Sequence, residues 1–199
     1  MKKILVVFGI AILAILPSCA TGVQRVDAGT QTDLSGYWND TDVKIVCESL
    51  IKSALNSPRV DNAIKAKGGV PKVIVGRFKN ESSEHINTSI ISSMMEIAIF
   101  NSGKLDFVAG GAERDALREE RQDQLTHASD DTQASVTKEI GADFMLTGTV
   151  RAIVERAENQ TVRTYFVNAE MSDIETGERI WMDQNSEIKK IIVKPKVRL

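Results

Sequence analysis

Cys19 is the residue whose surroundings specify a chemistry most clearly. It follows a basic pair, Lys2-Lys3, an apolar run from Ile4 to Leu16, and the short sequence Pro17-Ser18. A positively charged start, a short apolar region and a small-residue cleavage site are typical of a secretory signal peptide. The apolar run is shorter than the roughly 20 residues that a helix needs to span a bilayer. We therefore expect residues 1–18 to be a cleaved leader.

The cysteine itself changes how this leader is expected to end. The order Leu16-Pro17-Ser18-Cys19 resembles the bacterial lipobox, in which the thiol is acylated and the chain is then cut just before it. We expect residues 1–18 to be a lipoprotein signal peptide and Cys19 to carry a covalent lipid that anchors the protein to a membrane. The alternative is an ordinary signal peptide that happens to end near a cysteine.

The rest of the sequence holds no recognisable catalytic or metal-binding pattern. His85 and His127 have no cysteine or carboxylate at metal-ligand spacing, and the common nucleophile motifs are absent. The neighbouring acids Glu119-Glu120 and Asp130-Asp131 do not form an acid/base pair, because adjacent residues on a helix point in different directions. We expect no enzymatic activity, no metal and no cofactor apart from the lipid on Cys19.

Cys47 is the second of the two cysteines. It has no intramolecular partner if Cys19 is acylated, so a disulfide framework is excluded. It falls on the apolar stripe of a predicted helix, where a cysteine behaves as a small buried hydrophobe. A reactive thiol is the alternative.

Composition and charge limit the class of protein. The 199 residues are 42% hydrophobic and 26% charged, with a net charge of -2, which favours one globular domain and gives no reason to expect nucleic-acid binding. Residues 20–33 are small and polar, so we expect 19–33 to be a lipidated flexible tether. Its fully extended reach is about 50 Å. Residues 34–199 then form the globular domain.

The predicted elements follow from hydrophobic periodicity and turn residues. The helices are one that begins at Asp40-Thr41-Asp42 and ends before Pro58, and others over 85–101, 113–125 and 132–140. Residues 59–71 are predicted to be a loop. The strands are predicted over 72–78, 105–109, 144–155, 161–172 and 179–188 or beyond. In the helix over 85–101 the inward residues are expected to be Ile86, Ile90, Ile91, Met94, Ile97 and Ala98.

This order predicts an α+β fold. It consists of a single mixed sheet of about five strands, flanked by helices and ending in a three-stranded meander. A tight hairpin at Thr176-Gly177 joins the last two strands.

Two groups of residues are candidates for a partner surface. Arg114, Arg118 and Arg121 lie on one face of a highly charged helix, which is either a solvated face or a polar contact surface. Tyr37 and Trp38 stand where the tether meets the domain. Such an aromatic pair either clamps the first helix onto the sheet or forms a platform for a ligand.

Five segments of the sequence resemble the LpoB family of penicillin-binding-protein activators. They are Asp33–Asp42, Val75–Ser82, Asn101–Val108, Gly141–Gly148 and Asp173–Trp181. The Gly-Ala-Asp and Thr-Gly-Glu segments are shared with the TolB amino-terminal domain and the CsgG secretion lipoprotein. The resemblance therefore implies a TolB amino-terminal-like sheet flanked by helices.

The same resemblance implies a function and a location. It implies a non-catalytic outer-membrane lipoprotein, facing the periplasm, that docks on a bifunctional penicillin-binding protein and stimulates its peptidoglycan synthesis. Ala20 is not the aspartate that commonly retains lipoproteins in the inner membrane, which agrees with an outer-membrane location. Two alternatives remain: a CsgG-like structural or secretion lipoprotein, and a module that binds cell-wall fragments near Tyr37 and Trp38.

Overall fold

The structure is a computed structural model that describes residues 25–27, 30–31, 33, 35–127 and 141–194. Cys19, the expected leader and the helix predicted over 132–140 lie outside these residues. Asp33–Leu199 form one compact unit and Met1–Thr32 a separate one. Every buried hydrophobic residue of the described chain belongs to the larger unit. None of the described helices has the length and apolar character needed to cross a bilayer.

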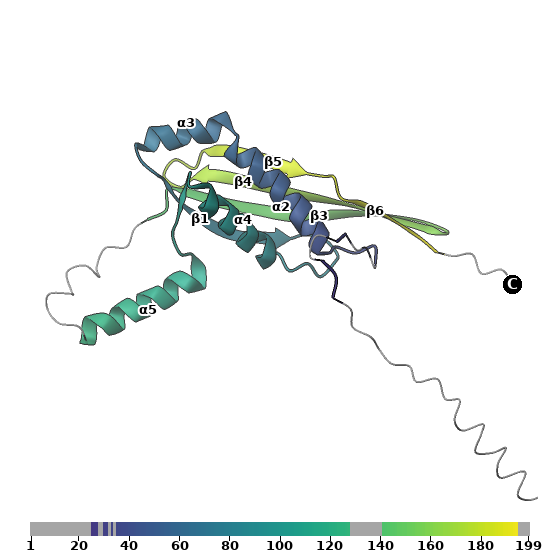
Figure 1. The fold of residues 1–199 in the computed structure, drawn as a ribbon, viewed down its shortest axis with the longest axis horizontal. Coiled ribbons are helices and arrows are strands. Elements are labelled where there is room, and N and C mark those ends of the chain that lie inside the picture. The colour runs from purple at the N-terminus through teal and green to yellow at the C-terminus, as the bar shows by residue number, and fades with distance from the viewer. Residues whose placement is uncertain (1–24, 28–29, 32, 34, 128–140, 195–199) are drawn as a thin grey trace, which may run out of the picture. The chain divides into compact units, whose positions relative to one another are not determined.

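The described elements of the compact unit are four helices and six strands (Figure 1). The helices are α2 (Asp40–Leu55), α3 (Pro58–Lys67), α4 (Ser89–Ser102) and α5 (Gly111–His127). The strands are β1 (Lys72–Asn80), β2 (Asp106–Phe107), β3 (Phe144–Ala157), β4 (Gln160–Asp173), β5 (Arg179–Asn185) and β6 (Lys189–Val193).

All six strands form one mixed sheet in the order β2-β1-β3-β4-β5, with β6 also paired to β4. β1 runs parallel to both β2 and β3, whereas β3, β4 and β5 form an antiparallel meander. The α+β fold, the single mixed sheet and the final meander are therefore confirmed.

The number of strands differs from the prediction because the last strand is interrupted. β5 pairs with residues 167–172 of β4, and β6 pairs with residues 160–164 of the same strand. Between them the chain leaves the regular ladder, although the carbonyl of Ile188 still accepts the Tyr165 amide at 2.9 Å. One continuous sequence pattern thus becomes two strands along the same edge of β4.

One face of the sheet is covered by α2 and α4, which pack on each other, on β5 and on β1 (Figure 1). Alternate residues of β3 and β4 point into this layer, because successive side chains of a strand lie on opposite faces. The largest of these buried side chains are Phe144, Leu146, Tyr165 and Met171. The opposite face, which we call the open face, carries the intervening, more exposed side chains.

Residues 58–67 form the helix α3, so the prediction of a loop over 59–71 was wrong for most of its length. Pro58 occupies the first turn, where a proline costs no hydrogen bond, and Gly68 ends the helix with a φ of 71°. Val60 is buried, and Ala63 and Ile64 pack against the core. This i, i+3, i+4 apolar stripe is present in the sequence. The many charged residues around it led to the prediction of a loop instead of a helix.

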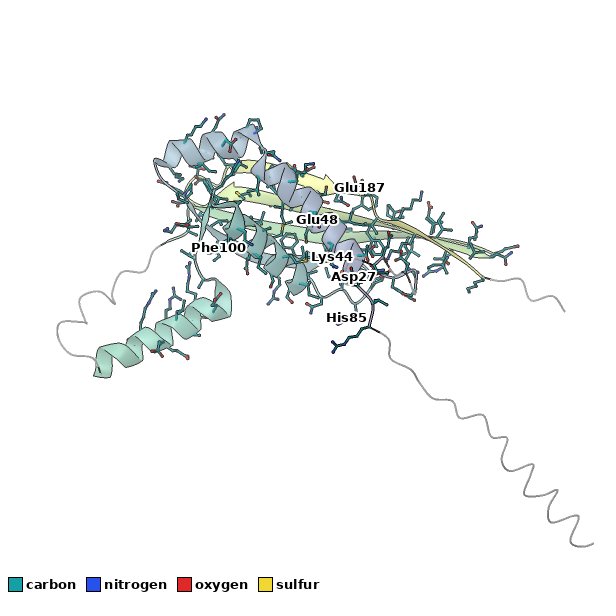
Figure 2. All side chains as sticks on the ribbon, in the orientation of Figure 1. Asp27, Lys44, Glu48, His85, Phe100 and Glu187 are labelled. Carbon is teal, nitrogen blue, oxygen red and sulfur yellow. The ribbon has the colours of Figure 1, made fainter. Side chains whose placement is uncertain are left out.

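The helix α4 begins at Ser89, later than the predicted start at residue 85. Its buried residues are Ile91, Met95 and Ile99. Ile90 and Ile97 were expected to point inward, but these residues are 49% and 61% exposed. Phe100, which Figure 2 labels, is 63% exposed. Because α4 is apolar on two faces, the pattern alone could not show which face meets the sheet.

Cys47 is fully buried on the core side of α2. Burial, with a smaller contribution from the charge of Glu48, raises the pKa of its thiol to about 12. The thiol is therefore protonated at neutral pH and serves as a small core residue, as predicted.

Two sequence segments close one end of the sheet by polar contacts, where Phe144 pairs with Asp173. The Asp143 carboxylate accepts the Lys72 amide at 2.7 Å, and the Asp143 amide donates to the Lys72 carbonyl at 2.7 Å. Asp173 accepts the amides of Glu175 and Thr176 at 2.9 and 3.0 Å. These bonds fix the start of β1 beside β3 and shape the β4–β5 hairpin.

Gly148 is required where β3 crosses beside β1. It lies opposite Phe78 in the register, and a Cβ atom there would stand 2.1 Å from the Phe78 ring and 2.4 Å from the carbonyl oxygen of Asn168. Both distances are far below van der Waals contact, and the second involves backbone that cannot move aside cheaply.

We predict that Gly148→Ala destabilises the domain by at least about 2 kcal/mol, because overpacked sites typically cost 1–3 kcal/mol. For a domain of this size the midpoint of thermal unfolding should fall by roughly 4–8 °C. Gly69→Ala is the matched control, because its added methyl group meets nothing within 4 Å. Equal unfolding temperatures for the two variants would contradict this account of Gly148.

Candidate functional site

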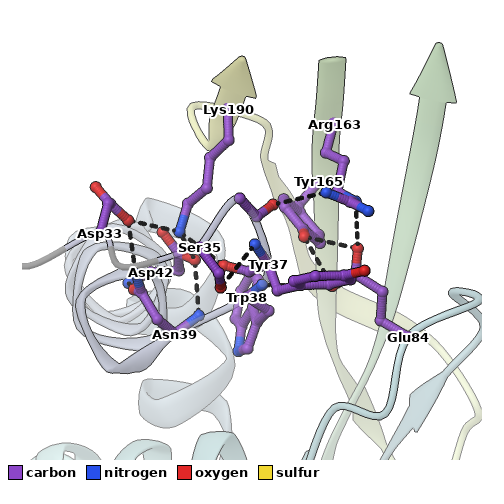
Figure 3. Close-up of polar contacts among 11 residues, drawn as sticks. Asp33, Ser35, Tyr37, Trp38, Asn39, Asp42, Glu84, Arg163, Tyr165 and Lys190 are labelled. Carbon is purple, nitrogen blue, oxygen red and sulfur yellow. Dashed lines mark hydrogen bonds and ion pairs between the residues drawn. The ribbon is translucent and has the colours of Figure 1, made fainter. Parts of the chain in front are cut away.

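Trp38 anchors the beginning of α2 to the middle of β4 (Figure 3). Its ring meets that of Tyr165 edge-on, with 5.2 Å between the centroids and an interplanar angle of 63°. Its backbone amide donates to Glu84 Oε2 at 3.3 Å. Trp38 is only partly exposed and packs against the core, as the clamp interpretation of this residue requires.

Glu84, in the connection between β1 and α4, is the polar centre of this site. Its carboxylate accepts the Tyr165 hydroxyl at 2.8 and 2.9 Å. Glu84 Oε1 also forms an ion pair with Arg163 Nε at 3.0 Å, with only 8% and 10% of the two side chains exposed. Burial, followed by the hydrogen bond to Glu84, raises the pKa of Tyr165 well above its ordinary value. The hydroxyl therefore stays a donor.

Tyr37 covers the other side of Arg163. The guanidinium carbon lies 4.1 Å from the centroid of the Tyr37 ring, a cation–π contact. Arg163 Nη1 also donates to the carbonyl of Gly36 at 3.3 Å. The contact with Arg163 holds the Tyr37 ring in position. Because 53% of Tyr37 remains exposed, one side of the ring is accessible to a partner.

Lys190 of β6 forms a second anchor for the same segment (Figure 3). Its ammonium lies 2.7 Å from Asp42 and 2.8 Å from Asp33, and donates to the carbonyl of Tyr37 at 2.9 Å. Burial opposes its charge, but the two carboxylates together outweigh this effect and raise the pKa of Lys190. Asp42 also accepts the Asn39 amide in the capping box that begins α2.

This geometry gives Glu84 a structural role. Glu84 is surrounded by the donors of Trp38, Arg163 and Tyr165, so its carboxylate is already engaged. Within the described residues, no three His, Cys, Asp or Glu side chains come together as metal ligands would.

The arginines of α5 lie elsewhere in the fold. Arg114 Nε donates to the carbonyl of Ala109 at 2.8 Å, and Arg118 pairs with Asp115 at 3.2 Å. The helix follows β2, which pairs with the first residues of β1, whereas Glu84 follows the last residue of β1. The two predicted groups, the α5 arginines and Tyr37 with Trp38, are therefore separated along the length of β1.

The open face of the sheet holds a basic hollow that was not predicted from the sequence. This hollow, of about 450 Å³, is lined by residues of β1, β3, β4 and β5, among them the cations Arg77, Lys79, Arg151 and Arg179. Arg151 pairs with Glu81, and Arg179 with Glu170. Arg77 and Lys79 are exposed and have no ion-pair partner among the described residues. The alternation of basic residues on β1 could have indicated this surface.

We predict that Glu84→Gln lowers the free energy of unfolding by about 3 kcal/mol, because it leaves the buried Arg163 charge unpaired. The double variant Glu84→Gln/Arg163→Met should recover part of this loss, which a double-mutant cycle in urea would measure. Glu81→Gln, which breaks the exposed pair with Arg151, should change stability by less than about 1 kcal/mol. A similar small effect for both single variants would show that the buried pair is not structurally important.

Comparison with known protein families identifies the chain. The model of the family described as "Peptidoglycan-synthase activator LpoB" matches residues 42–187. This range includes α2 from its third residue onward, all of α3 to α5 and all of β1 to β5. No curated protein sequence matches significantly.

Solved structures that this chain matches include two LpoB domains. The C-terminal domain of LpoB from Escherichia coli is 16% identical, with a TM-score of 0.44, over 72% of this chain and 96% of that one. The corresponding domain from Salmonella enterica is 15% identical, with a TM-score of 0.41, over 73% and 97%. A lipoprotein from Neisseria meningitidis is 18% identical, with a TM-score of 0.39, over 60% and 83%.

The family model covers most of the chain, including every segment of the sheet except β6. Glu84, Arg163, Tyr165 and the β4–β5 hairpin fall within the matched range, whereas the segment Gly36–Asn39 and Lys190 lie outside it. The chain belongs to the LpoB family of peptidoglycan-synthase activators.

Proposed function

We propose that this protein is a non-catalytic lipoprotein that binds a bifunctional penicillin-binding protein and stimulates its peptidoglycan synthesis. The observation that carries the proposal is the match of the LpoB family model to residues 42–187. Acyl chains on Cys19 anchor the protein in the outer membrane, and the domain faces the periplasm. One acyl chain gives only marginal membrane binding, so stable anchoring needs more than one.

The use of polar groups in the structure supports a binding role. The buried acids and bases of the Glu84 site are paired with one another, whereas unpaired cations are found on the accessible open face. A surface of fixed strands that presents exposed charges suits recognition of another protein, because electrostatic complementarity sets specificity and the rate of encounter.

The contact surface that we propose is the basic hollow on the open face. Arg77 and Lys79 are its uncompensated cations, so they can pair with carboxylates of a partner without first breaking an internal ion pair. α2 and α4 pack against the opposite face, so a partner that docks on the open face would leave the core undisturbed. The synthase segment that binds is therefore expected to be acidic.

The anchor limits where this contact can take place. The segment from Cys19 to Asp33 can reach about 50 Å when fully extended, so the synthase must present its binding region within that distance of the membrane that holds the lipid.

We predict that the lipidated protein, used as bait in detergent-solubilised envelopes from the same cell, recovers a bifunctional synthase. The charge reversal Arg77→Glu/Lys79→Glu should reduce recovery at least tenfold, because like charges placed across an interface cost several kcal/mol. Arg59→Glu/Lys65→Glu is the matched control, since it reverses one exposed arginine and one exposed lysine on α3.

Two further variants distinguish a failure of the proposed function from a failure of the proposed contact surface. Arg118→Glu/Arg121→Glu tests the face of α5, and Tyr37→Ala tests the exposed ring beside Arg163. If the α5 variant or the Tyr37 variant fails to recover the synthase while Arg77→Glu/Lys79→Glu still recovers it, the open face is not the contact surface. The proposed function would still stand in that case. If the unmodified bait recovers no synthase, the proposed function is wrong, and a stable ring of the extracted protein would then favour the CsgG-like alternative.

A further inference from the structure

A second surface lies beside α4, at the opposite edge of the sheet from β5. It is a groove of about 420 Å³ between the outer side of α4, the β2 segment and the first turn of α5. Its apolar lining comes from Val75, Ile97, Phe100, Phe107 and Val108. Exposure of Ile97 and Phe100 is 61% and 63%, so large apolar side chains face solvent here.

The packing of α4 on the sheet does not require Ile97 and Phe100 to be exposed. The core contacts of α4 are made by Ile91, Met95 and Ile99, on the far side of the helix from Ile97. Ile90, one heptad before Ile97, is also 49% exposed. Contiguous exposed apolar surface is uncommon on monomeric proteins and marks a contact surface.

The groove also contains two carboxylates that lack counterions. Glu96 and Glu113 both line it, and neither has an ion-pair or hydrogen-bond partner among the described residues. Burial, and then the nearby charge of Glu113, raises the pKa of Glu96 above its ordinary value. The two carboxylates therefore repel each other across an apolar surface. A cation placed between them would offset this repulsion by pairing with both.

We propose that this groove binds a protein segment in which an apolar side chain is flanked by lysine or arginine. The apolar side chain would cover Ile97 and Phe100, and the basic group would pair with Glu96 and Glu113. The charge of the groove excludes an acidic segment, so its occupant differs from the acidic partner expected at the basic hollow. The inference does not depend on the proposed function.

Glu96 and Glu113 also set the geometry of recognition. Glu96 belongs to α4 and Glu113 to the first turn of α5, so a basic group bound between them would link the two helices. Gly111, with a φ of 52°, begins α5 two residues before Glu113. The occupant would therefore fix the start of α5 relative to α4.

The test uses the compact unit, residues 33–199, because it contains the whole described core. It is applied to an array of pentapeptides in which leucine, isoleucine, phenylalanine or tryptophan is flanked by lysine or arginine. A matched array carries glutamate at the flanking positions. We expect basic peptides to be retained and acidic ones not. The best basic peptide should shift the isoleucine methyl resonances of Ile90 and Ile97 and leave those of Ile153 and Ile191 unchanged.

Variants assign the binding to the groove. Glu96→Gln/Glu113→Gln and Ile97→Ser should each weaken binding of that peptide at least tenfold. Glu119→Gln, an exposed charge on α5, and Ile191→Ser, which alters a side chain with the same 61% exposure, should not change it. Thermal unfolding of each variant checks that the fold is retained.

Three results would overturn the proposal. The first is equal retention of basic and acidic peptides. The second is binding that survives the groove variants, or that shifts methyl groups elsewhere. The third is a shift of the Ile97 methyl group with protein concentration alone, which would identify the occupant as a second copy of this chain.

Discussion

The buried ion pair between Glu84 and Arg163 is the interaction on which the arrangement of this domain depends. Both side chains are about nine-tenths buried, and such a pair is tolerated only when its remaining polar atoms are satisfied. Here Tyr165 and Trp38 donate to Glu84 and the carbonyl of Gly36 accepts from Arg163, whereas Arg163 Nε meets Glu84 Oε1 as an ion pair without hydrogen-bond geometry. The pair thereby joins three parts of the chain: the segment before α2, the connection after β1, and the middle of β4.

This arrangement separates the parts of the molecule that stabilise it from those that are free to bind. On the helix-covered face, β4 carries Arg163 and Tyr165, which contact Glu84, followed by an apolar row of Val167, Ala169 and Met171. On the open face, the strands present exposed cations around a hollow. A partner can therefore engage the open face without competing for the interactions that hold α2 and α4 in place.

Local patterns were sufficient to predict much of the fold. Alternation along β3 and β4, the glycine in the β4–β5 hairpin and the charged helix α5 were all recognised from short stretches of sequence. Errors arose where local signals conflicted. α3 combines a short apolar stripe with many charges, and α4 is apolar on two faces, so its orientation depends on which face finds the sheet.

The candidate site could be predicted only in part for a related reason. A clamp was one of two interpretations of Trp38, but its contacts, Glu84 and Tyr165, could not be predicted because they are 81 residues apart in the sequence. Nothing near Glu84 in the sequence distinguishes this buried glutamate from the exposed acidic residues of the chain. Pairing of Glu84 with Arg163 and Tyr165 requires the register of β4 against the end of β1, which only the assembled sheet provides.

The central claim is that this domain stimulates a peptidoglycan synthase without catalysing a reaction itself. The most direct test is the rate of glycan polymerisation and cross-linking by a purified bifunctional synthase from the same cell, with and without residues 33–199. The account predicts that the domain alone forms no product and that adding it raises the rate of the synthase in a saturable manner. Rates that remain unchanged at saturating concentrations, for every bifunctional synthase of that cell, would contradict it.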